Sequence, residues 1–217
     1  MTKPGRNALI VHEARQVKTV GMDRLGQSDF AIPFLLPTLS EAALKLAEYL
    51  VSYIEDDSRL IRAGETMAWA TSVLRFNAVG DELVVSSLNV KRDEFDETAD
   101  NALLNWNEQR AVCSAASSAY VQTQLIEMMV VSPDVEAGGP LDHGVRYSFN
   151  PPNSGWWIFG LKYTGGIETM RRIHVGDVVQ SCPGLTTYLA LEPGFCFSLI
   201  PDPRVWFEEE VAKQPPV

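Results

Sequence analysis

Two segments of the chain carry apolar residues at the spacing of an amphipathic helix. The first, residues 41–56, has apolar positions at intervals of three and four: Ala43, Leu46, Ala47, Leu50 and Ile54. Ser40, a favoured N-cap residue, precedes it. Asp56 and Asp57 are unfavourable near the negative pole of a helix dipole, so we expect them just beyond the helix end. The second segment, residues 97–116, follows the same pattern: Ala99, Ala102, Leu103, Trp106, Cys113 and Ala116.

Runs rich in β-branched, aliphatic and aromatic residues predict strands around these helices. Residues 66–76 and 82–89 flank a short loop, 77–81, and therefore predict a β-hairpin. Other runs predict strands over residues 8–11, 125–131, 145–149, 155–159 and 195–200. Short helical segments are expected over residues 167–173 and from Pro183 to Tyr188.

The remaining segments are expected to be less regular. Glycines and prolines interrupt most of residues 1–38, which we predict to be a partly irregular arm packed on the body of the protein. Residues 132–141 form a predicted loop through Gly138-Gly139-Pro140. In the proline-rich tail from Pro201, only Trp206 and Phe207 are expected to be held in place.

This order of elements predicts an α+β fold in which antiparallel sheets pack against a few helices. A length of 217 residues suits one large domain or two small ones. We expect a single unit over residues 1–217. The alternative is a division into an N-terminal part, 1–135, and a C-terminal part, 141–205.

A pair of adjacent tryptophans marks the most distinctive strand. Asn153-Ser154-Gly155 follows Pro151-Pro152 and has the composition of a turn, and the aromatic run Trp156-Trp157-Ile158-Phe159 comes directly after it. Neighbouring side chains of a strand point to opposite faces, so one tryptophan should enter the core while the other lies under a helix or near the surface. We take Trp157 as a candidate binding residue, and we expect Trp106 to be largely buried.

Two spaced segments in this region carry a family resemblance. Ser154-Gly155-Trp156-Trp157-Ile158-Phe159, followed by Pro183-Gly184-Leu185-Thr186-Thr187-Tyr188-Leu189-Ala190-Leu191-Glu192-Pro193-Gly194-Phe195, resembles the C-terminal domain of bacterial immunity proteins of the immunity protein 33 type. The resemblance covers roughly residues 145–200. It implies a non-enzymatic protein that neutralises a cognate toxin effector of a polymorphic toxin system, such as one delivered by type VI secretion. The family usually has an aspartate where this chain has Asn153.

The net charge of the protein indicates which kind of partner it binds. The formal net charge is −10 and the pI is near 4.8, which argues against a nucleic-acid-binding surface and favours a basic partner, for instance a nuclease toxin. The densest acidic run consists of Asp93, Glu94, Asp96, Glu97 and Asp100. Acidic residues also stabilise the start of a helix, so this run has a structural explanation besides its candidate role in partner binding.

The cysteines and the N-terminus indicate a cytoplasmic protein. Cys113, Cys182 and Cys196 are odd in number and lack metal-site spacing, so we expect buried free thiols rather than disulfides or a zinc site. The apolar run at residues 8–11 is too short for a signal peptide, and no stretch approaches membrane-spanning length.

The usual catalytic motifs are missing from the sequence. It contains no Gly-x-Ser-x-Gly elbow, no phosphate-binding glycine loop and no His-Glu-x-x-His helix. We therefore expect no enzymatic activity, no cofactor and no metal. The alternative is a small metal-dependent enzyme or ligand-binding sensor, in which the loop residues Asp142 and His143 would meet His174 in space.

Overall fold

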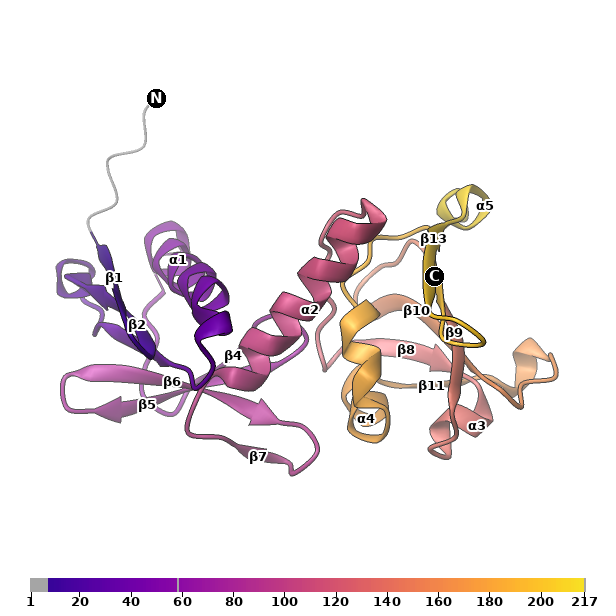
Figure 1. The fold of residues 1–217 in the computed structure, drawn as a ribbon, viewed down its shortest axis with the longest axis horizontal. Helices are drawn as coiled ribbons and strands as arrows, with labels where there is room; N and C mark the ends of the chain where they lie inside the picture. Colours follow the sequence, from indigo (N-terminus) through magenta and orange to yellow (C-terminus); the bar gives the residue numbers. More distant parts are fainter. Residues whose placement is uncertain (1–7, 58, 217) are drawn as a thin grey trace. The chain divides into compact units, whose positions relative to one another are not determined.

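The structure is a computed structural model that describes residues 8–57 and 59–216 (Figure 1). The chain divides into two compact units, one formed by Met1–Asn89 and Asp93–Asn107 and the other by Val90–Arg92 and Glu108–Val217. Each unit has its own sheet and its own hydrophobic core. The predicted α+β class is confirmed.

The first unit is built on one sheet with strand order β1-β2-β3-β6-β5-β4, and β7 pairs with β6. β3 and β6 are parallel, and the other pairs are antiparallel. Its elements are β1 (Leu9–Glu13), β2 (Gln16–Val20), η1 (Met22–Leu25), β3 (Phe30–Pro33), η2 (Pro37–Leu39), α1 (Ser40–Asp57), β4 (Thr66–Ala68), β5 (Val73–Val79), β6 (Glu82–Asn89) and β7 (Glu94–Phe95).

Helix α1 confirms the first helical pattern. Ala43, Leu46, Ala47 and Leu50 are fully buried in the core of this unit, as their spacing predicts. The helix continues through Asp57, so the expectation that Asp56 and Asp57 lie beyond its end is wrong. The unfavourable interaction of these aspartates with the helix dipole costs less than about 1 kcal/mol, and the packing of the apolar face, which stabilises the helix, outweighs it.

The first unit corrects two other expectations. Residues 9–33 are not an irregular arm, because β1, β2 and β3 pair in sequence at one edge of the sheet; residues 1–7 lie outside the described part. The run 66–76 is two strands, β4 and β5, which pair with each other around a turn where Ala70 has a φ of 49°. The predicted hairpin forms, with its second strand at residues 82–89 as predicted and its first strand extended to Val79.

The second unit has a sheet with strand order β11-β8-β10-β9-β12-β13. β8 and β10 are parallel, and the other pairs are antiparallel. The remaining elements are α2 (Asp100–Ala116), which begins in the first unit, β8 (Met128–Val131), α3 (Pro133–Glu136), β9 (Leu141–Arg146), β10 (Asn153–Gly160), η3 (Ile167–Thr169), β11 (Arg171–His174), α4 (Val175–Ser181), η4 (Pro183–Tyr188), β12 (Phe195–Ser198), β13 (Arg204–Phe207) and α5 (Glu209–Ala212).

Several helices and strands of this unit begin or end at other residues than predicted, mostly because pairing between strands sets their limits. Helix α2 confirms the second helical pattern, although it starts at Asp100. β9 starts at Leu141, so Asp142 and His143 belong to a strand and not to a loop. The predicted helix at 167–173 is a 3₁₀ turn followed by β11, which pairs with β8. β13 adds a further strand in the tail by pairing with β12, and α4 was not predicted.

Three further observations bear on the sequence analysis. All three cysteines are free, with Cys113 and Cys196 buried and Cys182 half-buried. Among the described residues, no helix has the length and apolar character needed to cross a membrane. Residues 135–141, where the sequence suggested a boundary, lie inside the second unit; the division of the chain into independently folding domains stays a prediction.

Candidate functional site

The ladder between β8 and β10 is interrupted by a bulge at Ser154–Trp156. Asn153 lies opposite Met128 and Trp157 lies opposite Val130, so β10 uses extra residues between these two pairs. Gly155 has a φ of 80°, and a Cβ atom there would collide with the carbonyl oxygen of Tyr147. Only glycine fits at this position without strain.

Ser154 satisfies the polar groups that the bulge leaves unpaired. Its hydroxyl donates to the carbonyl oxygen of Met128 at 2.9 Å and accepts a longer bond, 3.4 Å, from the backbone N–H of Trp156. A buried serine at this point thus replaces part of the missing ladder. After this bulge, strand alternation places the two tryptophans on opposite faces of the sheet.

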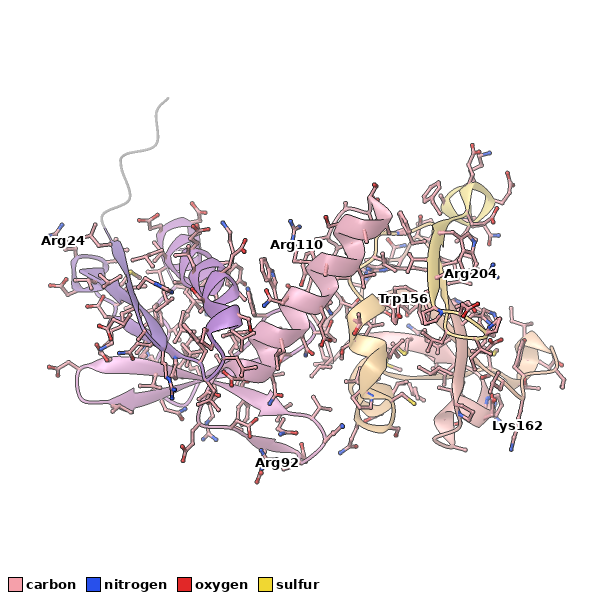
Figure 2. All side chains as sticks on the ribbon, in the orientation of Figure 1. Arg24, Arg92, Arg110, Trp156, Lys162 and Arg204 are labelled. Carbon is pink, nitrogen blue, oxygen red and sulfur yellow. The ribbon has the colours of Figure 1, made fainter. Side chains whose placement is uncertain are left out.

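Trp156 points into the core of the second unit. It is fully buried, its ring centroid is 5.7 Å from that of Phe197, and its indole N–H donates to the carbonyl oxygen of Leu189 at 3.2 Å. Figure 2 shows Trp156 within this unit, while Lys162 and Arg204 project at its periphery. The expectation that one tryptophan of the pair is a core residue is confirmed.

Arg146 is buried beside Trp156 and ties together the backbone around it. Its Nη1 donates to the carbonyl oxygens of Val121 at 2.8 Å, Leu189 at 3.2 Å and Leu191, and its Nε donates to that of Ser154 at 3.2 Å. Its Nη2 has no partner among the described residues. Burial lowers the pKa of Arg146 to about 10, opposed by the charge of Glu127, so the guanidinium remains charged near neutral pH.

Arg146 and Trp156 explain why the two segments that carry the family resemblance belong together. The carbonyl oxygen of Leu189, in the second segment, accepts from both side chains and also from the hydroxyl of Thr123 at 2.6 Å. Tyr188 of the same segment stacks on Phe197 at 4.5 Å between centroids. The strand with the two tryptophans and the segment from 183 to 195 therefore share one core.

The opposite face of this sheet, which we call the outer face, carries a row of half-buried aromatic side chains. Trp157 meets Tyr147 edge-on at 5.8 Å, His143 stacks on Phe159 at 4.6 Å, and Phe159 contacts Tyr163 at 5.1 Å. None of these residues belongs to the core cluster formed by the inner face with α4, η4 and the second half of α2. In Figure 1, α4 lies along the sheet of this unit.

A small hollow opens on the outer face where the bulge separates β8 from β10. Its volume is about 100 Å³, and its lining comes from three strands: Met128, Val130, Asn153, Gly155, Trp156, Trp157 and Arg172. The guanidinium of Arg172 donates to the Oδ1 atom of Asn153 across it. The indole N–H of Trp157 is buried and has no acceptor among the described residues. Trp157, the predicted binding residue, thus forms one wall of a recess.

The predicted acidic residues lie in the first unit and have mixed roles. Asp100 accepts a hydrogen bond from the backbone N–H of Leu35 at 3.0 Å, and Asp96 accepts one from the amide of Asn101. Asp93, Glu94 and Glu97 are exposed. The structural explanation therefore accounts for part of this run, and the binding role stays a prediction for the rest.

The structure does not bring Asp142, His143 and His174 together. The Nδ1 atom of His143 and the Oδ2 atom of Asp142 are hydrogen-bonded at 3.0 Å. However, β8 and β10 lie between β9, which holds His143, and β11, which holds His174. Three strand spacings put the two histidines at least about 14 Å apart. No three His, Cys, Asp or Glu side chains in the described part are grouped so that they could hold a metal ion.

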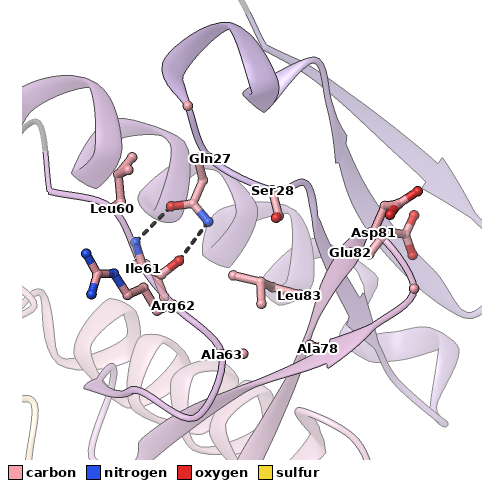
Figure 3. Close-up of a pocket in the computed structure, with 12 residues that line it drawn as sticks. Gln27, Ser28, Leu60, Ile61, Arg62, Ala63, Ala78, Asp81, Glu82 and Leu83 are labelled. Atoms are coloured by element: carbon pink, nitrogen blue, oxygen red, sulfur yellow. Dashed lines mark hydrogen bonds between the residues drawn. The ribbon is translucent and has the colours of Figure 1, made fainter.

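A larger cavity, about 500 Å³, lies in the first unit beside the turn between β5 and β6 (Figure 3). Gln27 forms part of its wall and exchanges two hydrogen bonds with the backbone of Ile61, at 2.8 and 3.0 Å. Glu82, on the opposite side, forms an ion pair with Lys18 at 2.9 Å. These polar groups are paired within the protein, so they serve the fold.

Comparison with known protein families finds a match, which covers most of the second unit. Residues 108–208 match the Imm33-like domain. The C-terminal part of the chain is thus similar to immunity proteins of the immunity protein 33 type, as the tryptophan strand and the segment from 183 to 195 suggested. The matched residues include the bulge, Trp156, Trp157, Arg146 and the whole outer face. The searches of curated proteins and of solved structures found no match.

Sequence reasoning missed Arg146 and Arg172. Arg146 lies between Val145 and Tyr147 in a predicted strand, where a buried charge has to be paired or hydrogen-bonded, and this was a usable signal. Arg172 had no comparable signal, because only the pairing of β11 with β8 brings it beside Trp157.

Proposed function

We propose that this chain is an immunity protein that binds a cognate bacterial toxin effector and neutralises it without catalysis. The observation that carries the proposal is the match of residues 108–208 to the Imm33-like domain. The contacts of Ser154, Gly155 and Trp156 support it, because they give a structural reason for each residue of the segment on which the resemblance rests.

The outer face of the Imm33-like domain is the surface we propose for toxin binding. It combines half-buried aromatic rings with exposed arginines, the residue types that contribute most to protein interfaces. Trp157 lies at its centre, with one edge of its ring packed on Tyr147. We place the protein in the cytoplasm, where it would act on a toxin delivered by a polymorphic toxin system, for instance by type VI secretion.

Co-expression with the toxin encoded beside this gene tests the proposal. We expect the chain to restore growth of cells that produce the toxin, and to form a complex with it that is stable on size exclusion. A variant without catalytic activity in the toxin allows both proteins to be purified in quantity. Loss of viability despite co-expression, together with separate elution of the two proteins, would contradict the proposed function.

The acidic residues of the first unit suit a second role in the same function, which is to attract a basic toxin. Most of the excess of acidic over basic residues falls in this unit, which includes the exposed Asp93, Glu94 and Glu97. We propose that a toxin with net positive charge, such as a nuclease, is steered by this field. Steering acts over about 10 Å at 0.1 M salt and raises the association rate more than it changes the final contacts.

Reversal of these three charges is expected to slow toxin association. In the triple variant Asp93→Lys, Glu94→Lys, Glu97→Lys, the association rate constant at low salt should fall about tenfold, and its dependence on salt should flatten. Stopped-flow fluorescence at several salt concentrations measures both quantities. Asp96 and Asp100 are left intact because they hold backbone and side-chain hydrogen bonds. Association at the wild-type rate would rule out steering by this run.

A further inference from the structure

We propose that the hollow beside Trp157 receives an aliphatic side chain from an acidic segment of the toxin, whose carboxylate pairs with Arg172. The inference rests on the proposed function and names the chemistry of the contact. Its starting point is the bulge in β10, which separates β8 from β10 and opens the outer face at this one place.

The size of the hollow indicates a side chain as its occupant. About 100 Å³ is several times the roughly 30 Å³ that one water takes up in the liquid, and it is well below the approximately 300 Å³ at which small-molecule sites begin. A recess of this size, open on one face of a sheet, suits a single protruding residue of a partner. Interfaces commonly concentrate their binding energy in such well-packed pockets.

The lining indicates an aliphatic residue. The side chains of Met128 and Val130 form the part contributed by β8, and the ring of Trp157 forms the wall contributed by β10. An apolar side chain that enters displaces water from these apolar surfaces, which is favourable. Gly155 contributes no side chain, so the backbone of β10 leaves space at the bulge.

The charge around the hollow indicates that the inserted residue is flanked by a carboxylate. Arg172 is exposed and lines the hollow, and no Asp or Glu is among the lining residues. Arg172 forms no ion pair with a carboxylate of the described residues. An arginine fork binds a carboxylate through two parallel hydrogen bonds, so a toxin segment with Asp or Glu next to its aliphatic residue complements this rim. A toxin that is basic overall can present such a segment, because steering depends on net charge and this contact depends on local charge.

Binding measurements with the toxin identified by co-expression test the inference. In titration calorimetry with the full chain, Arg172→Glu should raise the dissociation constant about 30-fold or more, because it puts two like charges in contact. Val130→Phe should raise it about tenfold or more by filling the hollow. Arg172→Lys keeps the positive charge but cannot form two parallel hydrogen bonds with a carboxylate, so it should raise the dissociation constant less than Arg172→Glu does.

The matched control is Arg24→Glu, a charge reversal at an exposed arginine of the first unit (Figure 2). It should leave the dissociation constant within about twofold of wild type. Melting temperatures of all variants check that they remain folded.

The outcomes separate this inference from the proposed function. If the wild-type chain binds the toxin and both Arg172→Glu and Val130→Phe bind equally well, the inference is wrong and the immunity function stands. Tighter binding by Arg172→Glu would show a basic segment at this site and would overturn the inference. The same holds if the wild-type chain forms a dimer that both variants disrupt, because the occupant is then a second copy of this chain. If the wild-type chain binds no toxin, the proposed function and the inference fail together.

Discussion

Trp156→Ala is expected to lower the free energy of unfolding of the second unit by about 3 to 5 kcal/mol. The side chain is fully buried, contacts Phe197, and donates a hydrogen bond to Leu189. Its removal leaves a cavity and takes one of three hydrogen-bond donors from the carbonyl oxygen of Leu189, and the two effects add. This loss is a large part of the 5 to 15 kcal/mol that usually stabilise a domain.

Trp157→Ala is the matched control for this prediction, since it removes the same side chain from the next position of β10. Trp157 is half-buried on the outer face, so its loss should lower the free energy of unfolding by only about 1 to 2 kcal/mol but should weaken toxin binding. Urea denaturation followed by circular dichroism measures the stability of both variants. Equal losses for the two tryptophans would show that the assignment of inner and outer faces is wrong.

Trp106→Ala is expected to lower the free energy of unfolding by an amount between those of Trp156→Ala and Trp157→Ala. Trp106 stacks on Trp69 with 6.2 Å between ring centroids, but it is only half-buried. The expectation from the sequence that it is largely buried is therefore too strong. The helical spacing predicts that Trp106 belongs to the apolar stripe of α2, but in the first unit the fully buried part of this stripe is Ala102 and Leu103.

Arg146→Met is expected to destabilise the second unit by about 3 kcal/mol or more. The substitution keeps most of the side-chain volume and removes a buried charge, which by itself favours the variant. It also leaves the carbonyl oxygens of Val121, Leu189, Leu191 and Ser154 without this donor. The carbonyl oxygen of Leu189 keeps Trp156 and Thr123 as donors. Each of the other buried acceptors that loses its partner costs about 1 to 3 kcal/mol, so the lost hydrogen bonds outweigh the relieved desolvation.

Arg146→Lys separates the charge from the hydrogen-bond geometry. Lysine retains the positive charge but cannot serve carbonyl oxygens on several sides at once, so its stability should lie between those of wild type and Arg146→Met. Urea denaturation of wild type, Arg146→Lys and Arg146→Met under the same conditions gives the order of their free energies of unfolding. A methionine variant as stable as wild type would mean that burial of the charge costs as much as these hydrogen bonds contribute, as happens in some buried ion pairs.

Local patterns were sufficient for some elements of the candidate site and not for others. The Ser154-Gly155-Trp156-Trp157 segment predicted a turn, a strand and two tryptophans on opposite faces, because glycine geometry and strand alternation act within a few residues. The choice of which tryptophan is buried depends on the bulge, and the bulge depends on how β10 pairs with β8. The sequence predicts a loop at Asp142 and His143, and this is wrong because their strand forms through pairing with β10 and β12, which no local pattern shows.

The sequence by itself determined the two long helices, the α+β class, the tryptophan strand and the family resemblance of the C-terminal part. These depend on periodicity and on short motifs, whose physical causes are local. Only the tertiary structure decided that Arg146 binds the distant carbonyl oxygens of Val121, Leu189 and Leu191. It also decided that β11 brings Arg172 beside Trp157 and that two strands separate His143 from His174. Each of these depends on contacts between residues far apart in the chain, and such contacts are set by the packing of the whole sheet.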